Sequence, residues 1–563
     1  MAMTQPGTGS ASQDQQKSDR SVRRAHRLMR GLLVLGLILL GPLSGRAVAQ
    51  RPHAGGTVIF GYNQPIDSFI PVFSPTSIMD DGAQVLLYRP LFWIGRNVSI
   101  DYGRSIGTGI TVSPDNTVYS VTMRPDYKWS DGTPVTASDV AYCFNLIKTW
   151  GTKYGYYGIG GLPTAVKAFT VLSPTKFSIT LTHPANPIYF ELSGLAQLRP
   201  LPAHAWKAYS PTFLDHHQTD LGVLSVVDGP YKLTKFQLNQ FARFERNPMY
   251  SGHKSSLDTF IIQYFSSEAA LFAALKTGAI QIGPLGFTQY NAAGQLANLK
   301  TYDWNWASFT YIFFNFRNPT VSYFMKDVKV RQAMQSLIDQ PLMNQVLYHG
   351  HAHSGYSPVP PIPSTYLSPR AKEPGYGFPY NPAKANAMLD ADGWKMVNGV
   401  RQKNGHKLAF TYGVSSDFDI GVRQAQIIQQ DFLKAGIQMS LRVAPFSVLL
   451  ADVFSKSASW DATTFGWIYY PNFYPLGDGN FGTGGGANFG AYSDPKLDAF
   501  IKETETVPGN KGIYDYQDYA AQSMPALWLD TSSTIIKYQP NIQGITDFLN
   551  PVWNFGPEYL SLS

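Results

Sequence analysis

The chain has little cysteine, little charge and no long apolar run. Cys143 is the only cysteine, so no disulfide can form within the chain, and we expect it to be a small core residue. The apolar run from Leu32 to Leu40 is well short of the roughly 20 residues that span a bilayer. Charged residues make up 15% of the chain, and the basic ones are scattered beyond the N-terminal segment. We therefore expect no membrane anchor and no nucleic-acid partner.

Signatures of common enzymes are also lacking. The chain has no H-E-x-x-H, C-x-x-C, G-x-S-x-G or G-x-x-x-x-G-K-[ST] motif. A glycine-rich stretch from Gly482 to Gly486 follows a turn rather than a strand, and its spacing does not fit a dinucleotide site. We expect neither an enzyme nor a cofactor. A secreted hydrolase remains the alternative of another class.

The N-terminal segment is laid out as a secretory signal. Its arginines precede the apolar run, and Ala47-Val48-Ala49 then gives the small-x-small pattern of signal-peptidase cleavage. The sequence predicts a signal peptide over residues 1–49, cleaved near Ala49, and a periplasmic or secreted protein. The pair Arg23-Arg24 leaves the twin-arginine export route open beside the general one.

Length and periodicity predict more than one domain. A chain of 563 residues exceeds the roughly 250 to 300 residues at which a single core stops growing. Glu268 to Thr277 has a helical pattern ended by Gly278, whereas Ile437 to Val443 alternates as a strand does. Because such helices and strands alternate along the chain, we expect α/β lobes with mainly parallel, buried sheets.

The stretch from Tyr119 to Lys148 is the most specific part of the sequence. It joins an alternating strand to a turn at Ser130-Asp131-Gly132, and then to a helix whose capping box begins at Thr136. This block resembles the signature of the family 5 extracellular solute-binding proteins, the peptide and nickel receptors of ABC importers. Later segments are similar in order and spacing, among them 229–233, 245–250, 274–278, 327–333, 381–394 and 494–498.

The resemblance implies a two-lobed periplasmic-binding-protein-like fold, with an extra subdomain in the first lobe. We expect lobe I over residues 50–312, with the extra subdomain at about 91–224. Lobe II would span 313–528, and 529–563 would return to lobe I. The resemblance also implies hinge segments near Asn315 and Leu529, which would let the lobes close on a solute.

The strongest candidate for ligand binding is the aromatic segment from Phe465 to Pro475. In peptide-binding relatives an aspartate that pairs with the peptide amino group stands at the position of Tyr470, and some place an arginine at the position of Thr464. Neither charge is present here, and Asp478 could replace the acid only if its loop folds back. Aromatic rings would then stack on the solute. The predicted ligand-binding residues are Tyr62, Asn63, Trp467, Tyr469, Tyr470 and Phe473.

Three alternating histidines are the weak candidates for a metal site. On an extended chain His349, His351 and His353 would face one side, but no Cys, Asp or Glu lies near them in the sequence. A solvated connector after the helix is the favoured interpretation, so we predict no metal site.

The resemblance implies the extracytoplasmic binding component of an ABC importer. It would capture a solute between its lobes and deliver it to permease subunits, contacting the membrane complex only peripherally. We expect a monomer that binds a peptide or a peptide-like compound. A non-peptide solute such as a sugar or a nickel chelate remains the alternative, because the charged anchors for a peptide are missing.

Overall fold

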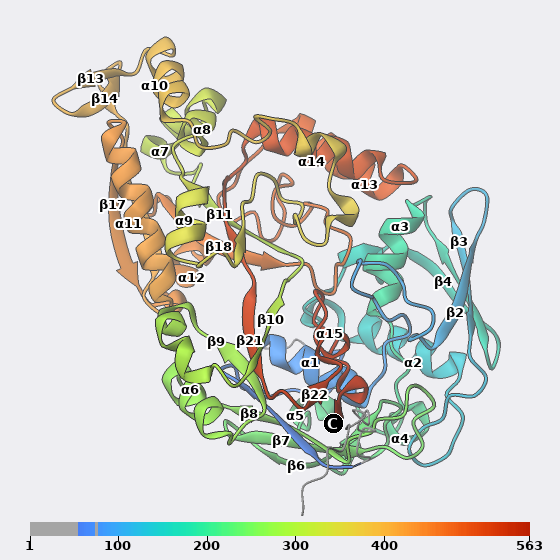
Figure 1. Cartoon of the computed structure of the whole chain (residues 1–563). Helices are drawn as coiled ribbons and strands as arrows, with labels where there is room; N and C mark the ends of the chain where they lie inside the picture. The colour runs from blue at the N-terminus through green and yellow to red at the C-terminus, as the bar shows by residue number, and fades with distance from the viewer. Residues whose placement is uncertain (1–54, 74–76) are drawn as a thin grey trace, which may run out of the picture. The chain divides into compact units, whose positions relative to one another are not determined.

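Figure 1 shows the fold in a computed structural model, which describes residues 55–73 and 77–563. The predicted signal peptide, residues 1–49, lies outside the described residues. The described residues belong to one compact unit. Within the described ranges, no helix combines the length and the apolar character needed to cross a membrane.

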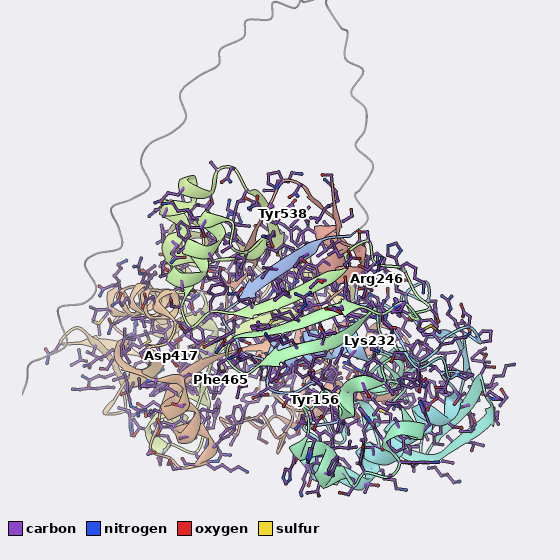
Figure 2. The ribbon with its side chains drawn as sticks, turned by 90° about the horizontal axis from the view of Figure 1, so that it is seen from below. Tyr156, Lys232, Arg246, Asp417, Phe465 and Tyr538 are labelled. Atoms are coloured by element: carbon purple, nitrogen blue, oxygen red, sulfur yellow. The ribbon has the colours of Figure 1, made fainter. Side chains whose placement is uncertain are left out.

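The largest sheet, which defines lobe I here, has seven strands. Their order is β10 (Lys300–Trp304), β21 (Thr534–Tyr538), β9 (Ile282–Leu285), β1 (Thr57–Tyr62), β8 (Thr259–Tyr264), β7 (Phe241–Arg246) and β6 (Tyr231–Gln237). Only the pairs that β1 makes with β8 and β9 are parallel. Figure 2 shows Lys232 on β6 and Arg246 on β7 at one edge, and Tyr538 on β21 toward the other.

Lobe II is built on a five-stranded sheet. Its order is β17 (Gln438–Ala444), β16 (Ala409–Ser415), β18 (Ala462–Ile468), β11 (Ser308–Phe314) and β19 (Leu527–Leu529). Here β16 is parallel to β17 and β18, whereas β11 is antiparallel to both of its neighbours. The expectation of mainly parallel sheets is therefore wrong. The strands β6, β7 and β8 follow one another without an intervening helix and pair antiparallel, whereas a helix over residues 419–434 separates the parallel strands β16 and β17.

An extra subdomain within lobe I carries a third sheet, which is antiparallel throughout. Its order is β2 (Gly107–Val112), β3 (Val118–Met123), β5 (Lys176–Leu181) and β4 (Val166–Ser173). Helix α2 (Ala137–Trp150) follows β3 and contacts β4. The predicted capping box is present between Thr136 and Asp139, and Cys143 is buried and free, so both predictions are confirmed.

The remaining helices connect these sheets. Lobe I contains α1 (Ile78–Leu87), α3 (Pro187–Tyr189), α4 (Ala203–Trp206), α5 (Pro211–His216), α6 (Glu268–Thr277) and α15 (Ile545–Phe548). Helix α6 ends at Gly278 in the left-handed conformation, as predicted. Lobe II contains α7 (Pro319–Met325), α8 (Val328–Gln335), α9 (Gln340–Val346), α10 (Pro382–Ala391), α11 (Asp419–Lys434), α12 (Phe446–Phe454), α13 (Pro495–Thr506) and α14 (Lys511–Ser523).

Short strands complete the fold. They are β12 (Ala352–His353) paired with β20 (Thr531–Ser532), β22 (Ile542–Gln543) paired with β23 (Ser561–Leu562), and a small sheet of β13 (Lys395–Val397), β14 (Val400–Lys403) and β15 (His406–Lys407).

The chain passes between the two large sheets twice. It leaves the lobe I sheet after Trp304 and enters the lobe II sheet at Ser308, and it returns between Leu529 and Thr534. The boundaries expected from the sequence, 312/313 and 528/529, fall within β11 and β19, and the division into lobes by residue number stays a prediction.

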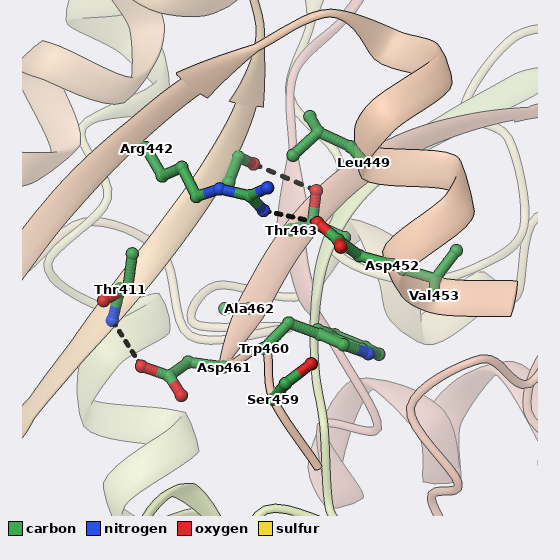
Figure 3. A pocket seen from close by; sticks show the side chains of 11 residues that line it. Thr411, Arg442, Leu449, Asp452, Val453, Ser459, Trp460, Asp461, Ala462 and Thr463 are labelled. Atoms are coloured by element: carbon green, nitrogen blue, oxygen red, sulfur yellow. Dashed lines mark hydrogen bonds and ion pairs between the residues drawn. The ribbon is translucent and has the colours of Figure 1, made fainter. Parts of the chain in front are cut away.

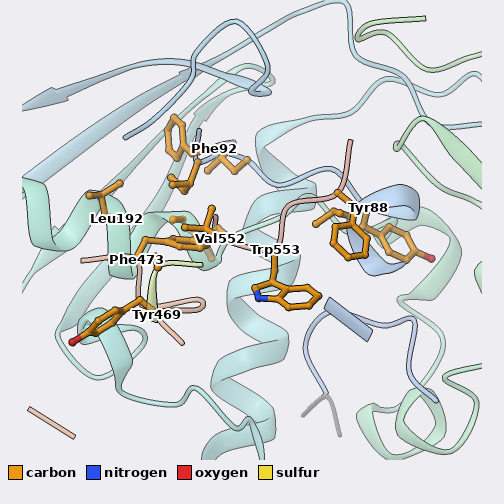
Figure 4. Packing of buried hydrophobic residues seen from close by; sticks show 14 of the residues in the cluster. Tyr88, Phe92, Leu192, Tyr469, Phe473, Val552 and Trp553 are labelled. Carbon is orange, nitrogen blue, oxygen red and sulfur yellow. The ribbon is translucent and has the colours of Figure 1, made fainter. Parts of the chain in front are cut away.

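The largest hydrophobic cluster is not confined to lobe I. Figure 4 shows Tyr469 and Phe473, which follow β18, packed with Leu192, Val552 and Trp553. A second cluster fills lobe II around α8, α11 and the strands β16 and β19. The aromatic segment after β18 thus extends from lobe II into the core of lobe I, and this continuity positions the candidate site.

Candidate functional site

A small cavity lies where the extra subdomain and α1 of lobe I meet the segment after β18. Asp81, Tyr156 and Arg199 line it from lobe I, and Tyr470 and Phe473 line it from lobe II. Its volume is about 20 Å³. That space holds about one water molecule, so a larger solute can enter only if the two lobes separate.

Asp81 comes from the first turn of α1. Ser77 caps this helix and forms a capping box with Asp80. Of the two adjacent carboxyls, Asp80 and Asp81, the first therefore stabilises the start of the helix. Asp81, the next residue, is 5% exposed and faces the cavity. Its burial raises the pKa of the carboxyl to about 8, against the opposing effect of the nearby Arg199 guanidinium.

Tyr470 connects the two ionisable groups of lobe I, Asp81 and Arg199. Arg199 donates from Nη2 to the Tyr470 hydroxyl at 2.6 Å, and the same hydroxyl hydrogen-bonds to the Asp81 carboxyl. Arg199 Nη1 is buried and has no hydrogen-bond partner among the described residues. A buried guanidinium group with an unused donor is suited to receive an anionic or carbonyl oxygen of a solute.

Aromatic rings form part of the cavity wall, together with prolines and the amide residues Gln197 and Asn554. Tyr470 makes edge contacts with Tyr156, at 6.4 Å between ring centroids, and with Phe473, at 5.5 Å. Figure 2 shows Tyr156 on the side of lobe I and Phe465 of β18 on the side of lobe II. Such rings exclude water, which strengthens the electrostatic interactions of Asp81 and Arg199.

Of the six predicted ligand-binding residues, Tyr470 and Phe473 line this cavity. Tyr62, at the end of β1, is 5% exposed, and its ring lies edge-on to Trp553 in the core of lobe I. Asn63 follows β1 and is exposed. The structure does not bring Tyr62 or Asn63 into the cavity, and their role in binding stays a prediction.

Trp467 and Tyr469 also lie outside the cavity wall. Trp467 is on β18 opposite Phe309 of β11, and it is partly buried. Tyr469 is 2% exposed and donates its hydroxyl to the Pro358 carbonyl at 2.8 Å. Asp478, considered as a substitute for the missing acid, lines a different cavity with Lys502 and Glu505 of α13. Asp478 therefore does not replace the missing acid in this cavity, and the role of Trp467 and Tyr469 in binding stays a prediction.

The three histidines lie near the first crossing between the sheets. His349 stacks on Tyr290 at 4.1 Å, His351 Nδ1 lies 2.9 Å from Asp303 Oδ1, and His353 Nε2 lies 3.0 Å from Asn305 Oδ1. No acidic residue is near the histidines in the sequence, but the fold brings Asp303, which is distant in sequence, beside His351. No group of three or more His, Cys, Asp or Glu side chains in the described residues could hold a metal ion.

A larger cavity in lobe II has different chemistry. It measures about 420 Å³ and lies between α12 and the strands β16, β17 and β18 (Figure 3). Its charged groups already have partners: Arg442 pairs with Asp452, and Asp461 accepts from the Thr411 amide at 2.7 Å. It contains none of the predicted ligand-binding residues. We therefore assign the candidate site to the cavity between the lobes.

Sequence reasoning missed Asp81 and Arg199. Asp81 had one available signal: it is a second carboxyl in a helix whose capping box uses only the first. Arg199, within the irregular stretch before α4, had none, because only the tertiary contact with Tyr470 distinguishes it from other arginines.

Comparisons with known proteins agree with this architecture. Residues 104–487 match the model of the bacterial extracellular solute-binding proteins, family 5 Middle. The oligopeptide-binding protein AppA of Bacillus subtilis is 24% identical over 502 residues, which cover 87% of this chain and 89% of the relative. The nickel-binding periplasmic protein of Escherichia coli is 25% identical over 365 residues, which cover 64% of this chain and 66% of the relative.

Solved structures share the fold. That of AppA from Bacillus subtilis, in complex with a nonapeptide, has a TM-score of 0.71 and 21% sequence identity, and the match covers 91% of this chain and all of that one. The family model matches more than half of the chain, and the solved structure of this relative shares the two-lobed α/β fold. The chain belongs to the bacterial extracellular solute-binding proteins of family 5.

Proposed function

We propose that this protein is the extracytoplasmic binding component of an ABC importer, and that it captures a peptide or a peptide-like compound between its lobes. Its partners would be the solute and the permease subunits, with only peripheral contact with the membrane complex. We expect it to act as a monomer in the periplasm or outside the cell, after cleavage of the signal peptide near Ala49. The name of the Bacillus subtilis relative, an oligopeptide-binding protein, supports this proposal.

The pairing of Asp81 and Arg199 around Tyr470 carries the proposal. The resemblance implies that peptide-binding relatives place an aspartate at the position of Tyr470, where its carboxylate would meet the amino group of the peptide. Here Asp81 supplies a carboxyl beside that position, but from the opposite lobe. A solute ammonium could replace the Tyr470 hydroxyl at Asp81, and a carboxylate or carbonyl oxygen could accept from Arg199 Nη1.

This arrangement couples solute binding to a proton. Without solute, burial raises the pKa of Asp81 to about 8, so the carboxyl is largely protonated at neutral pH. An ammonium bound at Asp81 favours the ionised form and would release the proton. Titration calorimetry in two buffers of different ionisation enthalpy measures that release. In an Asp81→Asn variant the buffer dependence should disappear.

The experiment that tests the function is identification of the solute. Native mass spectrometry of the purified protein, followed by denaturation, releases whatever copurifies, and calorimetry with a peptide mixture covers an empty protein. A peptide bound in the micromolar range or tighter would support the proposal. A protein that binds a sugar or another uncharged solute, and no peptide, would contradict it.

A metal chelate is the second candidate, on a specific observation. Arg199 offers an unused donor to an anionic chelator, and one relative is named a nickel-binding protein. Since the described residues hold no metal-ligating group of three, the metal would have to arrive with its own ligands. Nickel that binds only together with an anionic chelator would favour this candidate, and no binding under either condition would exclude it.

A further inference from the structure

We propose that Asn186 of the extra subdomain is a clasp that holds lobe II in the closed position by capping the C-terminal end of α13. This proposal rests on the proposed capture of a solute between the lobes. It adds a positioning residue that touches neither the cavity nor the solute. Figure 1 shows α3, which Asn186 precedes, beside α13 and α14 of lobe II.

Asn186 makes a dense set of contacts across the lobes. Its Nδ2 donates to the Thr504 carbonyl and to the Gly509 carbonyl, both at 3.0 Å, and its Oδ1 accepts from the Gly509 amide at 3.2 Å. Its own backbone amide donates to the Glu505 carbonyl at 2.6 Å. The side chain is fully buried. Four hydrogen bonds thus join one residue of lobe I to the α13–α14 hairpin.

The carbonyls that Asn186 reaches are ones that α13 cannot satisfy by itself. Thr504 and Glu505 lie in the last turn of the helix, where carbonyl groups have no partner further along the helix. A helix C-terminus usually meets this need with local groups or water. Here the donors come from the other lobe. Separation of the lobes would return these carbonyls and the Asn186 amide to water.

Asparagine suits this position because its side chain caps α3 and also donates hydrogen bonds to the end of α13. Asn186 is also the N-cap of α3, where its Oδ1 accepts from the Ile188 amide at 3.3 Å. A side-chain amide can accept for its own helix and donate to a neighbouring one at the same time, whereas serine or aspartate can only do the first in this geometry. A substitution can therefore remove the hydrogen bonds across the lobes and still keep the N-cap of α3.

The clasp predicts an effect on closure that needs no solute. Each intramolecular hydrogen bond gives a modest net stabilisation, so losing both Nδ2 hydrogen bonds should lower the ratio of closed to open protein about tenfold. The probe is the distance between spin labels on exposed positions of the two lobes, in Leu172→Cys and Leu433→Cys. Native Cys143 is buried and should not react.

The test variant is Asn186→Ser, which keeps a cap for α3 but is too short to reach α13. The matched control is Asn488→Ser. Asn488 is also buried, and its Nδ2 donates to the Gly482 and Tyr492 carbonyls at 2.9 and 2.8 Å, but these partners lie in lobe II. We expect a longer and broader distance distribution for Asn186→Ser without solute, and the parent distribution for Asn488→Ser even if it is less stable.

Two results would overturn the clasp: a parent-like distribution in Asn186→Ser, or equal broadening in both variants. If Asn186→Ser does not fold, Asn186→Asp replaces it, because aspartate is a good N-cap with the same shape. Its carboxylate would repel the two carbonyls at pH 7, and protonation at low pH should restore closure. Failure of the proposed function is seen separately, as absence of solute binding in the parent protein.

Discussion

The two sides of the contact between the lobes differ in chemistry. Lobe I contributes the ionisable groups, the Asp81 carboxyl and the Arg199 guanidinium, whereas lobe II contributes the neutral aromatic residues Tyr470 and Phe473. The lobe II segment from Phe465 to Pro475 contains no charged side chain, so by itself it offers no ionic anchor for a charged solute. The comparison teaches that the charge of a binding site belongs to the assembled surface, so a missing residue on one lobe can be replaced from the other.

The two cavities give a similar lesson. The cavity in lobe II is larger, about 420 Å³ against about 20 Å³, but its charged groups are paired with one another or with backbone. The small cavity keeps an unpartnered donor on Arg199. Unused hydrogen-bonding capacity, rather than volume, marks the place where a solute gains most from binding.

The largest expected effect comes from removing the positive charge of lobe I. Arg199→Gln should weaken binding of the identified solute by about 3 kcal/mol, because it removes a buried charged donor. Titration calorimetry measures the change. The matched control is Arg331→Gln, since Arg331 is equally buried but donates to backbone carbonyls within lobe II. Equal loss of affinity in both variants would contradict a direct role for Arg199.

Removing the acid of lobe I should change the dependence of stability on pH. The folded pKa of Asp81 is about 8, above its ordinary value of 3.8, so between these values the folded state binds more protons than the unfolded state. Stability conferred by the protonated carboxyl is therefore lost as the pH rises from about 4 to 8. Between pH 5 and pH 7 the parent should lose roughly 2 to 3 kcal/mol more than Asp81→Asn in the free energy of unfolding, measured without solute by urea denaturation. Parallel pH profiles would show that Asp81 is ionised in the folded protein.

A substitution of Trp467 tests whether the aromatic contribution of lobe II to solute binding includes this residue of β18. If this partly buried ring of β18 meets the solute when the lobes separate and close again, Trp467→Ala should weaken binding by about 1 to 3 kcal/mol. The free energy of unfolding, measured in parallel, separates binding from folding. Trp460→Ala is the control, because Trp460 lines the cavity of lobe II. Unchanged affinity in Trp467→Ala would remove it from the site.

The smallest effect should come from removing the Tyr470 hydroxyl, which hydrogen-bonds to both Asp81 and Arg199. Tyr470→Phe removes the hydroxyl that joins Arg199 to Asp81, but a solute that contacts both would replace it, so affinity should change by about 1 kcal/mol or less. Tyr469→Phe is the matched control, since its hydroxyl bonds to the Pro358 carbonyl outside the cavity. A loss in Tyr470→Phe that approaches that of Arg199→Gln would mean that Tyr470 itself binds the solute.

Local chemistry made several elements predictable. The capping box at Thr136 and the end of α6 at Gly278 depend on residues within one helical turn, so the sequence contains all of the interaction. The mixed sheets were not predictable in this way. Strand direction depends on which distant strands pair, as when β21 inserts between β9 and β10, and no periodicity encodes that choice.

The candidate site likewise combines features that follow from local sequence with contacts that depend on the tertiary structure. The sequence by itself determined the family resemblance, the aromatic segment after β18, and the loss of the expected charges at Tyr470 and Thr464, because each is a property of residues in a fixed order. Only the tertiary structure decided that Asp81 and Arg199 meet Tyr470, that Asp303 lies beside His351, and that Asn186 caps a helix of the other lobe. These contacts join residues far apart in the chain, and hydrogen bonds and ion pairs act only over a few ångströms, so they exist only once the lobes are packed.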